Sequence, residues 1–160
     1  MTMRQSFAVS SLFRERILLP PESISNSMLG YFFFREKILE IVLGDSETNI
    51  LYWVGKEIGN ALEISVAEEL EDIFLQLDFG QVHLEHQSPS SVSYRLTHNR
   101  LNLLPKKRLE SSLHLEAGLM AGAMEKLTGH YCAATLTIQE HKGSSSATIE
   151  ISIDEKSAIT

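Results

Sequence analysis

The sequence has very little cysteine, with the single residue Cys132 among its 160 amino acids. One cysteine excludes an intramolecular disulfide and a zinc site built on a cysteine pair. The chain also lacks a long hydrophobic run. Its most apolar stretch, 29–34, ends at Arg35 and falls short of the roughly 20 residues that a membrane-spanning helix needs. We therefore expect a cytoplasmic protein that has no signal peptide and does not span a membrane.

Basic residues are also scarce, because 14 Lys and Arg face 21 Asp and Glu, which gives a net charge of -7. Nucleic acids and anionic membranes are bound by clustered positive charge, so neither is expected as a main partner. The one basic cluster, Lys106 to Arg108, has no aromatic or Gly-rich sequence beside it. We interpret it as a solvated loop rather than a phosphate site.

The chain contains no set of residues typical of a metal site or a catalytic centre. His83 and His86 lie three apart in a predicted strand, so their side chains point to opposite faces of a sheet. The Gly-x-Ser-x-Gly and phosphate-loop patterns are absent. Cys132 occupies an inward strand position and is interpreted as a small core residue rather than a nucleophile. We predict no metal, no cofactor and no enzymatic activity.

The pattern of apolar residues predicts four helices and two β-hairpins. The helices are expected at 27–43, 47–61, 66–77 and 113–129, and in the third of these Ser65 and Glu68 fit the spacing of a capping box. Apolar and polar residues alternate at 81–85 and 92–97, and again at 130–140 and 146–153. Residues 99–111 are expected to form a loop.

These elements predict an α+β domain in which about four helices cover one face of a four-stranded antiparallel sheet. We divide the chain into an N-terminal arm at 1–21, a single domain at 22–154 and a C-terminal tail at 155–160.

The first predicted helix is apolar on every side. Tyr31 to Phe34 surround one turn, and more apolar residues surround the next turns. A helix of this kind is buried on all sides, either at the centre of its own domain or against a partner chain. If a partner chain covers it, Phe32 or Phe34 is the expected contact of a dimer interface.

The last predicted helix, 113–129, carries small residues on one face. Gly118, Ala121 and Gly122 can let the helix pack closely on a neighbour, or they can leave room for a ligand; we favour close packing. Glu116 lies beside them. We interpret it as a surface or interface charge in preference to a buried polar anchor.

Two sequence blocks resemble known families. Tyr52, Trp53, Gly55 and Lys56, together with 115–119, resemble the YslB-like family of uncharacterised bacterial proteins. The block from Ala117 to Gly129 and the strands after it are also similar to the vinyl-reductase-like domain and to the TRAPP-subunit fold. The resemblance implies an α+β fold, a homodimer formed through helices, and a buried apolar channel for a hydrophobic ligand. Many vinyl-reductase-like domains carry cysteines beside the last hairpin turn, where this chain has Gln139 and Ala147.

We therefore predict a homodimeric binding module without enzymatic activity. A small hydrophobic ligand would lie between the helices and the sheet, lined by Phe33, Trp53, Leu119 and Cys132. For Trp53 itself we favour a place in the core or the dimer interface over a role as a ligand platform. The alternative function is a dimeric adaptor that binds a partner protein and holds no ligand. A small hydrolase or reductase needs polar side chains that converge in a pocket, and the sequence offers none.

Overall fold

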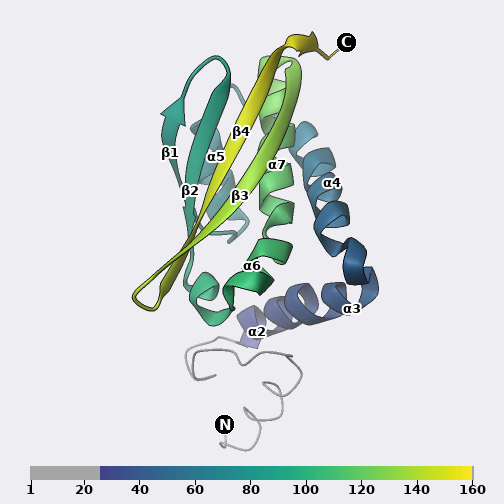
Figure 1. The fold of residues 1–160 in the computed structure, drawn as a ribbon, viewed down its shortest axis with the longest axis vertical. Coiled ribbons are helices and arrows are strands. Elements are labelled where there is room, and N and C mark those ends of the chain that lie inside the picture. Colours follow the sequence, from purple (N-terminus) through teal and green to yellow (C-terminus); the bar gives the residue numbers. More distant parts are fainter. Residues whose placement is uncertain (1–25, 160) are drawn as a thin grey trace, which may run out of the picture.

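The structure is a computed structural model that describes residues 26–159 (Figure 1). The predicted arm, 1–21, lies outside the described residues. The four strands are β1 (Gln81–Gln87), β2 (Ser91–Thr97), β3 (His130–His141) and β4 (Ser144–Ala158). They form one antiparallel sheet in the order β1-β2-β4-β3. The two hairpins therefore join through β2 and β4, where Tyr94 pairs with Ile149.

Alternation along the strands gives the sheet one apolar face and one polar face. Val92, Tyr94 and Leu96 of β2 are buried, and so are Ile149 and Ile151 of β4. The residues between them carry short polar or charged side chains that face away from the helices. This pattern confirms the predicted pairing of one buried face per hairpin. β4 continues to Ala158, so the strand includes most of the residues assigned to a tail at 155–160.

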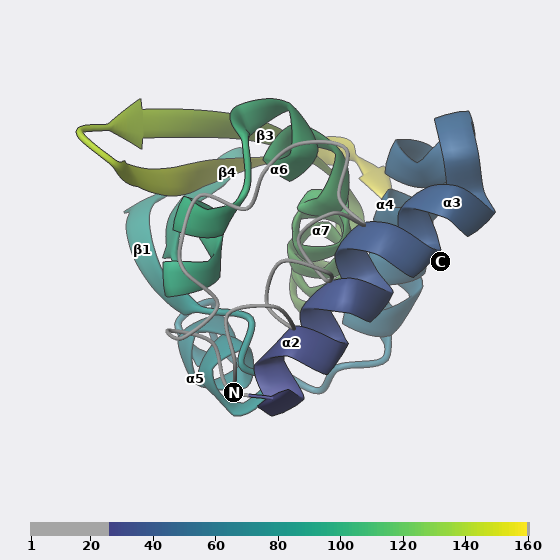
Figure 2. The ribbon, with the colours of Figure 1, turned by 90° about the horizontal axis from the view of Figure 1, so that it is seen from below.

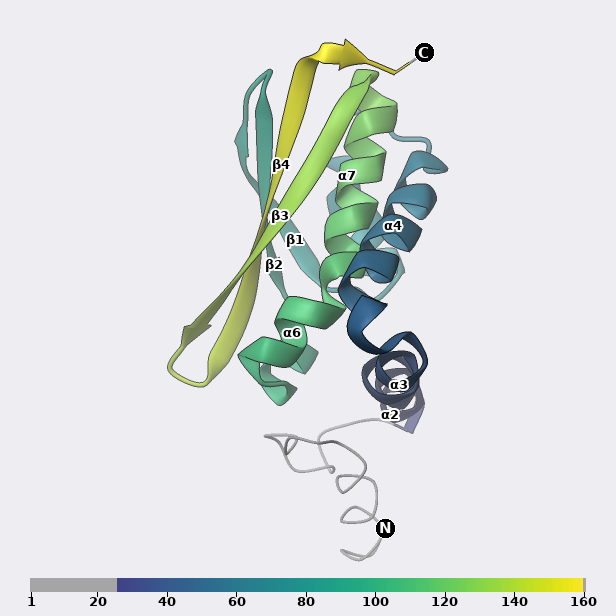
Figure 3. The same ribbon diagram turned by 45° about the vertical axis from the view of Figure 1, so that its right-hand side comes forward.

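Helices cover the apolar face of the sheet. α5 (Glu69–Gln76), α6 (Lys106–Ser112) and α7 (His114–Thr128) lie against the strands, and α4 (Glu47–Asn60) packs mainly on α7 (Figures 1 and 3). The predicted fold class, an α+β domain with helices on one face of a four-stranded antiparallel sheet, is confirmed. Because α4 sits behind α7, the sheet itself is covered by three helices rather than four.

The first helix is less regular than its sequence suggests. α2 (Asn26–Phe33) continues through a π-helical turn, η2 (Phe34–Ile38), into α3 (Leu39–Leu43). A 3₁₀ turn, η3 (Gly44–Ser46), then leads into α4. Of the two alternatives for burying this helix on all sides, the central position is excluded, because the helix crosses one end of the molecule and leaves Ile41 and Val42 exposed in the single chain (Figures 2 and 3).

Two local predictions are also corrected. α5 begins at Glu69 rather than at 66, and the backbone amide of Ser65 donates to the carboxylate of Glu69 instead of Glu68. The predicted loop at 99–111 is largely helical, with a 3₁₀ segment, η4 (Asn99–Leu103), followed by α6. Leu101, Leu103 and Leu109 bury their side chains in the core, which explains why this segment is ordered into helical turns.

Candidate functional site

The glycines of α4 and α7 bring the two helix backbones into direct contact. A Cβ atom on Gly118 would lie 2.0 Å from the carbonyl oxygen of Tyr52, and one on Gly122 would lie 2.1 Å from that of Lys56. Gly55 and Gly59 of α4 are equally close to α7. Ala121 is buried too. The small-residue face of α7 is therefore filled by α4, and the space between the two helices holds no room for a ligand.

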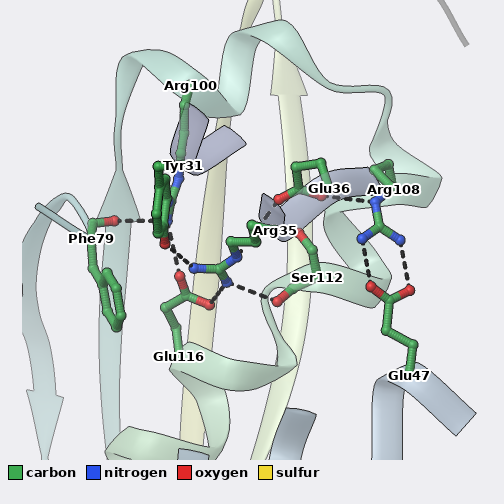
Figure 4. A network of polar contacts seen from close by, with 9 residues as sticks. All are labelled: Tyr31, Arg35, Glu36, Glu47, Phe79, Arg100, Arg108, Ser112 and Glu116. Carbon is green, nitrogen blue, oxygen red and sulfur yellow. Dashed lines mark hydrogen bonds and ion pairs between the residues drawn. The ribbon is translucent and has the colours of Figure 1, made fainter. Parts of the chain in front are cut away.

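A chain of alternating buried charges ties the first helix to the rest of the molecule (Figure 4). Glu116 of α7 has no exposed surface, and its two carboxylate oxygens accept hydrogen bonds from Arg35 of η2 and Arg100 of η4. The hydroxyl of Tyr31 accepts from both of these guanidinium groups, at 2.7 Å and 3.1 Å. Arg35 also donates to the carbonyl oxygen of Ser112, at 2.9 Å. The interpretation of Glu116 as a surface or interface charge is wrong.

The same chain of charges extends to the start of α4. Arg108 of α6 donates to the carboxylate of Glu36, at 2.8 Å, and to that of Glu47, at 2.7 Å (Figure 4). The basic cluster Lys106 to Arg108 therefore does not lie in a solvated loop. Lys106 and Lys107 are exposed, but Arg108 turns inward and joins three helices. The full series, in order, is Arg100, Glu116, Arg35, Glu36, Arg108 and Glu47.

Burial and opposite charge act against each other in this network. Burial by itself raises the pKa of Glu116, but Arg35 and Arg100 outweigh it and hold that pKa below the ordinary value of 4.5. Burial is the larger effect for Glu36 and raises its pKa, although Arg35 and Arg108 favour the ionised form. Three arginines and three glutamates balance, so the network carries no net charge. Its role in the single chain is to position helices, since removing any one member leaves the network with an unbalanced buried charge.

A second buried ion pair lies at the other end of the contact between α4 and α7. The ammonium group of Lys56 is 2.6 Å from the carboxylate of Glu125 and donates to the carbonyl oxygen of Cys132 at 3.0 Å. Its nitrogen also lies 4.0 Å from the ring centre of Tyr131 and 5.3 Å from that of Trp53. Lys56 therefore connects α4 and α7 with β3.

The side of α3 and α4 that faces away from α7 is apolar and exposed. We call it the outer apolar face; it comprises Ile41 and Val42 of α3 and Ile50, Trp53, Val54 and Ile58 of α4. Val42 is 70% exposed and Trp53 is 56% exposed. On α4 these side chains recur three and four residues apart, which places them on one side of the helix. An exposed apolar surface of this kind is typical of a contact with another molecule.

The four residues predicted to line a ligand channel lie in different surroundings. Leu119 and Cys132 are completely buried in the core, Phe33 is half-buried, and Trp53 points outward. Burial raises the pKa of the Cys132 thiol, which makes a thiolate nucleophile less accessible. Of the two predicted dimer contacts, Phe32 is 1% exposed and is buried by its own chain, whereas Phe34 is 52% exposed.

The grooves on the described part of the surface include two of similar volume. One, of about 650 Å³, lies between α7 and the sheet, and its apolar lining includes Val66, Val92, Met124, Leu127 and Ile153. The other, of about 690 Å³, is polar; His98, Asn102 and Arg95 are among the residues that line it.

The polar groove does not contain a catalytic histidine arrangement. The ring nitrogen Nδ1 of His98 accepts from the backbone amide of Arg100 at 3.0 Å, and Nε2 lies 3.4 Å from the carboxylate of Asp78. Both nitrogens are therefore engaged, and neither is free to take a proton from a serine hydroxyl. Within residues 26–159, no three His, Cys, Asp or Glu side chains gather closely enough to hold a metal ion.

Most of the charged residues in these networks could not be assigned from sequence. Arg35 and Glu36 follow Phe32 by three and four residues, which is the spacing of one helix face, and this spacing was the available signal. It does not reveal the partners, because Glu116 and Arg108 lie more than seventy residues away along the chain. No helix in the described part of the chain has the length and apolar character required to cross a bilayer.

Comparison with known proteins agrees with this fold. The profile of a family described as "Protein of unknown function (DUF2507)" matches residues 28–153. No curated protein matches the sequence. A vinyl-4-reductase family protein from Methanocaldococcus jannaschii has a similar structure, with a TM-score of 0.60 and 23% identity; the match covers 79% of this chain and 82% of that one.

Two further structures share the fold at lower identity. Subunit 3 of the trafficking protein particle complex from Naegleria fowleri gives a TM-score of 0.56 and 15% identity, over 81% of this chain and 95% of that one. An H-NOX mutant from T. tengcongensis gives a TM-score of 0.50 and 15% identity, and the match covers 97% of this chain and 88% of that one. At these identities the likeness establishes the fold and nothing further.

Proposed function

The chain belongs to the DUF2507 family of proteins of unknown function, and we propose that it is a non-enzymatic binding module that works as a homodimer. The outer apolar face of α3 and α4 supports this proposal. α4 carries two apolar sides, one with Leu51, Gly55 and Gly59 against α7 and the other with Ile50, Val54 and Ile58 toward solvent. A helix that is apolar on both sides is stable when both are covered, and the single chain covers only one.

A second copy of the chain is the partner that best fits the distribution of charge. Residues 61–94 contain seven acidic residues and no Lys or Arg, which accounts for the whole net charge of -7. This acidic segment includes α5 and β1, which lie on the far side of α7 from α4 (Figures 1 and 2). Two copies that meet through α3 and α4 would keep these acidic segments apart.

The sequence resemblance adds independent support. The resemblance of the block from Ala117 to Gly129 to the vinyl-reductase-like domain and the TRAPP-subunit fold implies a dimer formed through helices. We further assign the protein to the bacterial cytoplasm. Its single cysteine, Cys132, is free, and the cytoplasm keeps thiols reduced.

A hydrophobic ligand, if the module holds one, fits the groove between α7 and the sheet better than the predicted channel. The Naegleria subunit has palmitic acid covalently bound, but Cys132 is completely buried here and its pKa is raised, so an acyl link at this thiol is disfavoured. The groove beside Met124 and Leu127 is open and partly apolar, and it would accept an apolar chain without covalent attachment.

Native mass spectrometry and light scattering test this proposal together. We expect a species of twice 18.0 kDa at micromolar concentration, and any retained ligand would appear as added mass on it. Ile58→Ser on the outer apolar face should weaken association at least tenfold. Leu75→Ser is the matched control, because Leu75 is a comparably exposed apolar residue on α5. A wild-type chain that stays monomeric would refute the homodimer and leave the adaptor that binds another protein.

A further inference from the structure

Two exposed aromatic rings at the edge of the outer apolar face share a buried cation. Trp53 of α4 is 56% exposed and Tyr131 of β3 is 45% exposed, and the ammonium group of Lys56 lies near both ring centres, at 5.3 Å and 4.0 Å. These distances are within the range of cation–π attraction, which is stronger when the cation is desolvated. Lys56 itself is only 4% exposed.

The Lys56 ammonium group is held by three groups of its own chain. It pairs with the carboxylate of Glu125 and donates to the carbonyl oxygen of Cys132, and its nitrogen lies over the ring of Tyr131. Glu125 is fixed in turn, since it accepts from the backbone amide of Cys132 at 3.1 Å and from the amide group of Asn60 at 3.1 Å. The cation therefore cannot move without breaking contacts on α4, α7 and β3.

Large aromatic side chains that are exposed yet held in place are suited to anchor an interface. Tyrosine and tryptophan are enriched among the residues that dominate binding energy, and a ring that is already ordered loses little freedom when a partner covers it. Trp53 lies one turn from Ile50 on the same side of α4, and its ring also makes an edge contact with Tyr52 at 6.0 Å between centres. The cation–π contact with Lys56 further restricts the orientation of the Trp53 ring.

We infer that Trp53 and Tyr131 anchor the interface between two copies of this chain, and that Lys56 is a positioning residue that holds both rings ready for contact. This inference rests on the proposed homodimer and deepens it. It extends the contact from α4 onto the beginning of β3. It also gives the buried pair of Lys56 and Glu125 a role beyond charge balance within the fold.

Trp53 is the only tryptophan in the chain, so its fluorescence reports on the proposed contact directly. We expect its emission maximum to move to shorter wavelength as protein concentration rises through the dissociation constant. Trp53→Ala and Tyr131→Ala should each raise that constant by about a hundredfold in sedimentation experiments. Leu75→Ala, outside the contact, should leave it unchanged.

The double variant Lys56→Met with Glu125→Gln tests the positioning role without leaving one buried charge unpaired. We expect about a tenfold higher dissociation constant and a faster loss of Trp53 fluorescence anisotropy in the dilute, monomeric protein. Lys56→Arg keeps a cation near the rings, so its Trp53 fluorescence anisotropy should decay more slowly than that of the double variant. A purely structural role would lower unfolding stability while the anisotropy decay and the dissociation constant stay as in the wild type.

The outcomes separate the two proposals. If Ile58→Ser dissociates the protein but Trp53→Ala and Tyr131→Ala do not, the anchoring inference is wrong and the homodimer stands. If the wild type is monomeric and Trp53 emission does not change with concentration, both the homodimer and the anchors are refuted.

Discussion

Glu116 illustrates how far a single side chain depends on residues that are remote in sequence. It stands among small and apolar neighbours in α7, and nothing nearby supplies a positive charge. Its partners, Arg35 and Arg100, come from η2 and η4 and reach it only in the folded chain. Its burial could be suspected from the residues beside it, but its two cations could not be identified from the local pattern.

Glu116→Gln should be strongly destabilising. The neutral amide keeps the size of the side chain but leaves Arg35 and Arg100 without their shared counter-charge, and loss of one partner in a buried pair costs about 3–5 kcal/mol. Urea unfolding followed by circular dichroism measures the change. Glu150→Gln, on the exposed side of β4, is the matched control and should change the free energy of unfolding by less than about 0.5 kcal/mol. Equal effects at the two positions would contradict the proposed role of Glu116.

At the scale of elements, the contact between α4 and α7 is controlled by glycine. The sequence shows Gly55 and Gly59 four apart in one helix and Gly118 and Gly122 four apart in another, and this spacing already indicates close approach of a backbone. It does not show that the two pairs face each other. The structure pairs them, and the same contact turns the second apolar side of α4 toward solvent.

Gly118→Ala should destabilise the protein, although alanine is the better helix former. The added Cβ would meet the carbonyl oxygen of Tyr52 at 2.0 Å, so α4 has to move away from α7, and overpacking of this kind costs roughly 1–3 kcal/mol. Gly30→Ala in α2 is the control, because its Cβ meets nothing within 4 Å. That substitution should be neutral or stabilise by about 0.5–1 kcal/mol. Thermal unfolding of the two variants gives the comparison, and a stable Gly118→Ala would rule out the tight contact.

The first helix shows what an element-scale pattern leaves open. Its apolar circumference predicts burial by its own chain or by a partner; within the single chain Phe32, Arg35 and Glu36 face inward while Ile41 and Val42 are exposed. The π-helical turn at Phe34–Ile38 inserts an extra residue and shifts which side of the following helix faces the core. Hydrophobic periodicity assumes a regular helix, so it could not indicate this change.

At the scale of the whole molecule, the buried charges make stability depend on pH. The pKa of Glu116 is lowered in the folded protein, so its contribution is complete above its ordinary pKa of 4.5 and is lost as the pH falls below that value. Glu36 affects the pH dependence of stability in the opposite direction. Its raised pKa means that ionisation opposes folding, and this cost is relieved as the pH falls toward 4.5.

The difference in unfolding free energy between the wild type and Glu116→Gln should therefore depend on pH. We expect it to be largest near neutral pH and to shrink progressively below about pH 4.5. Urea titrations of both proteins between about pH 7 and about pH 3 measure it. A difference that stays constant down to the lowest pH, while both proteins remain folded, would show that the charge of Glu116 is not what stabilises the network.

The amino-acid sequence by itself determined the elements and the class of the fold. Alternation set the four strands and their buried sides, and helical spacing set α4, α5 and α7, because these signals are local and repeat along the chain. The tertiary structure decided which surfaces meet. It paired the glycines of α4 and α7, assembled the buried charges from distant segments, and left Trp53 and Val42 exposed. Such contacts join residues far apart in sequence, where no periodic pattern can specify the partner.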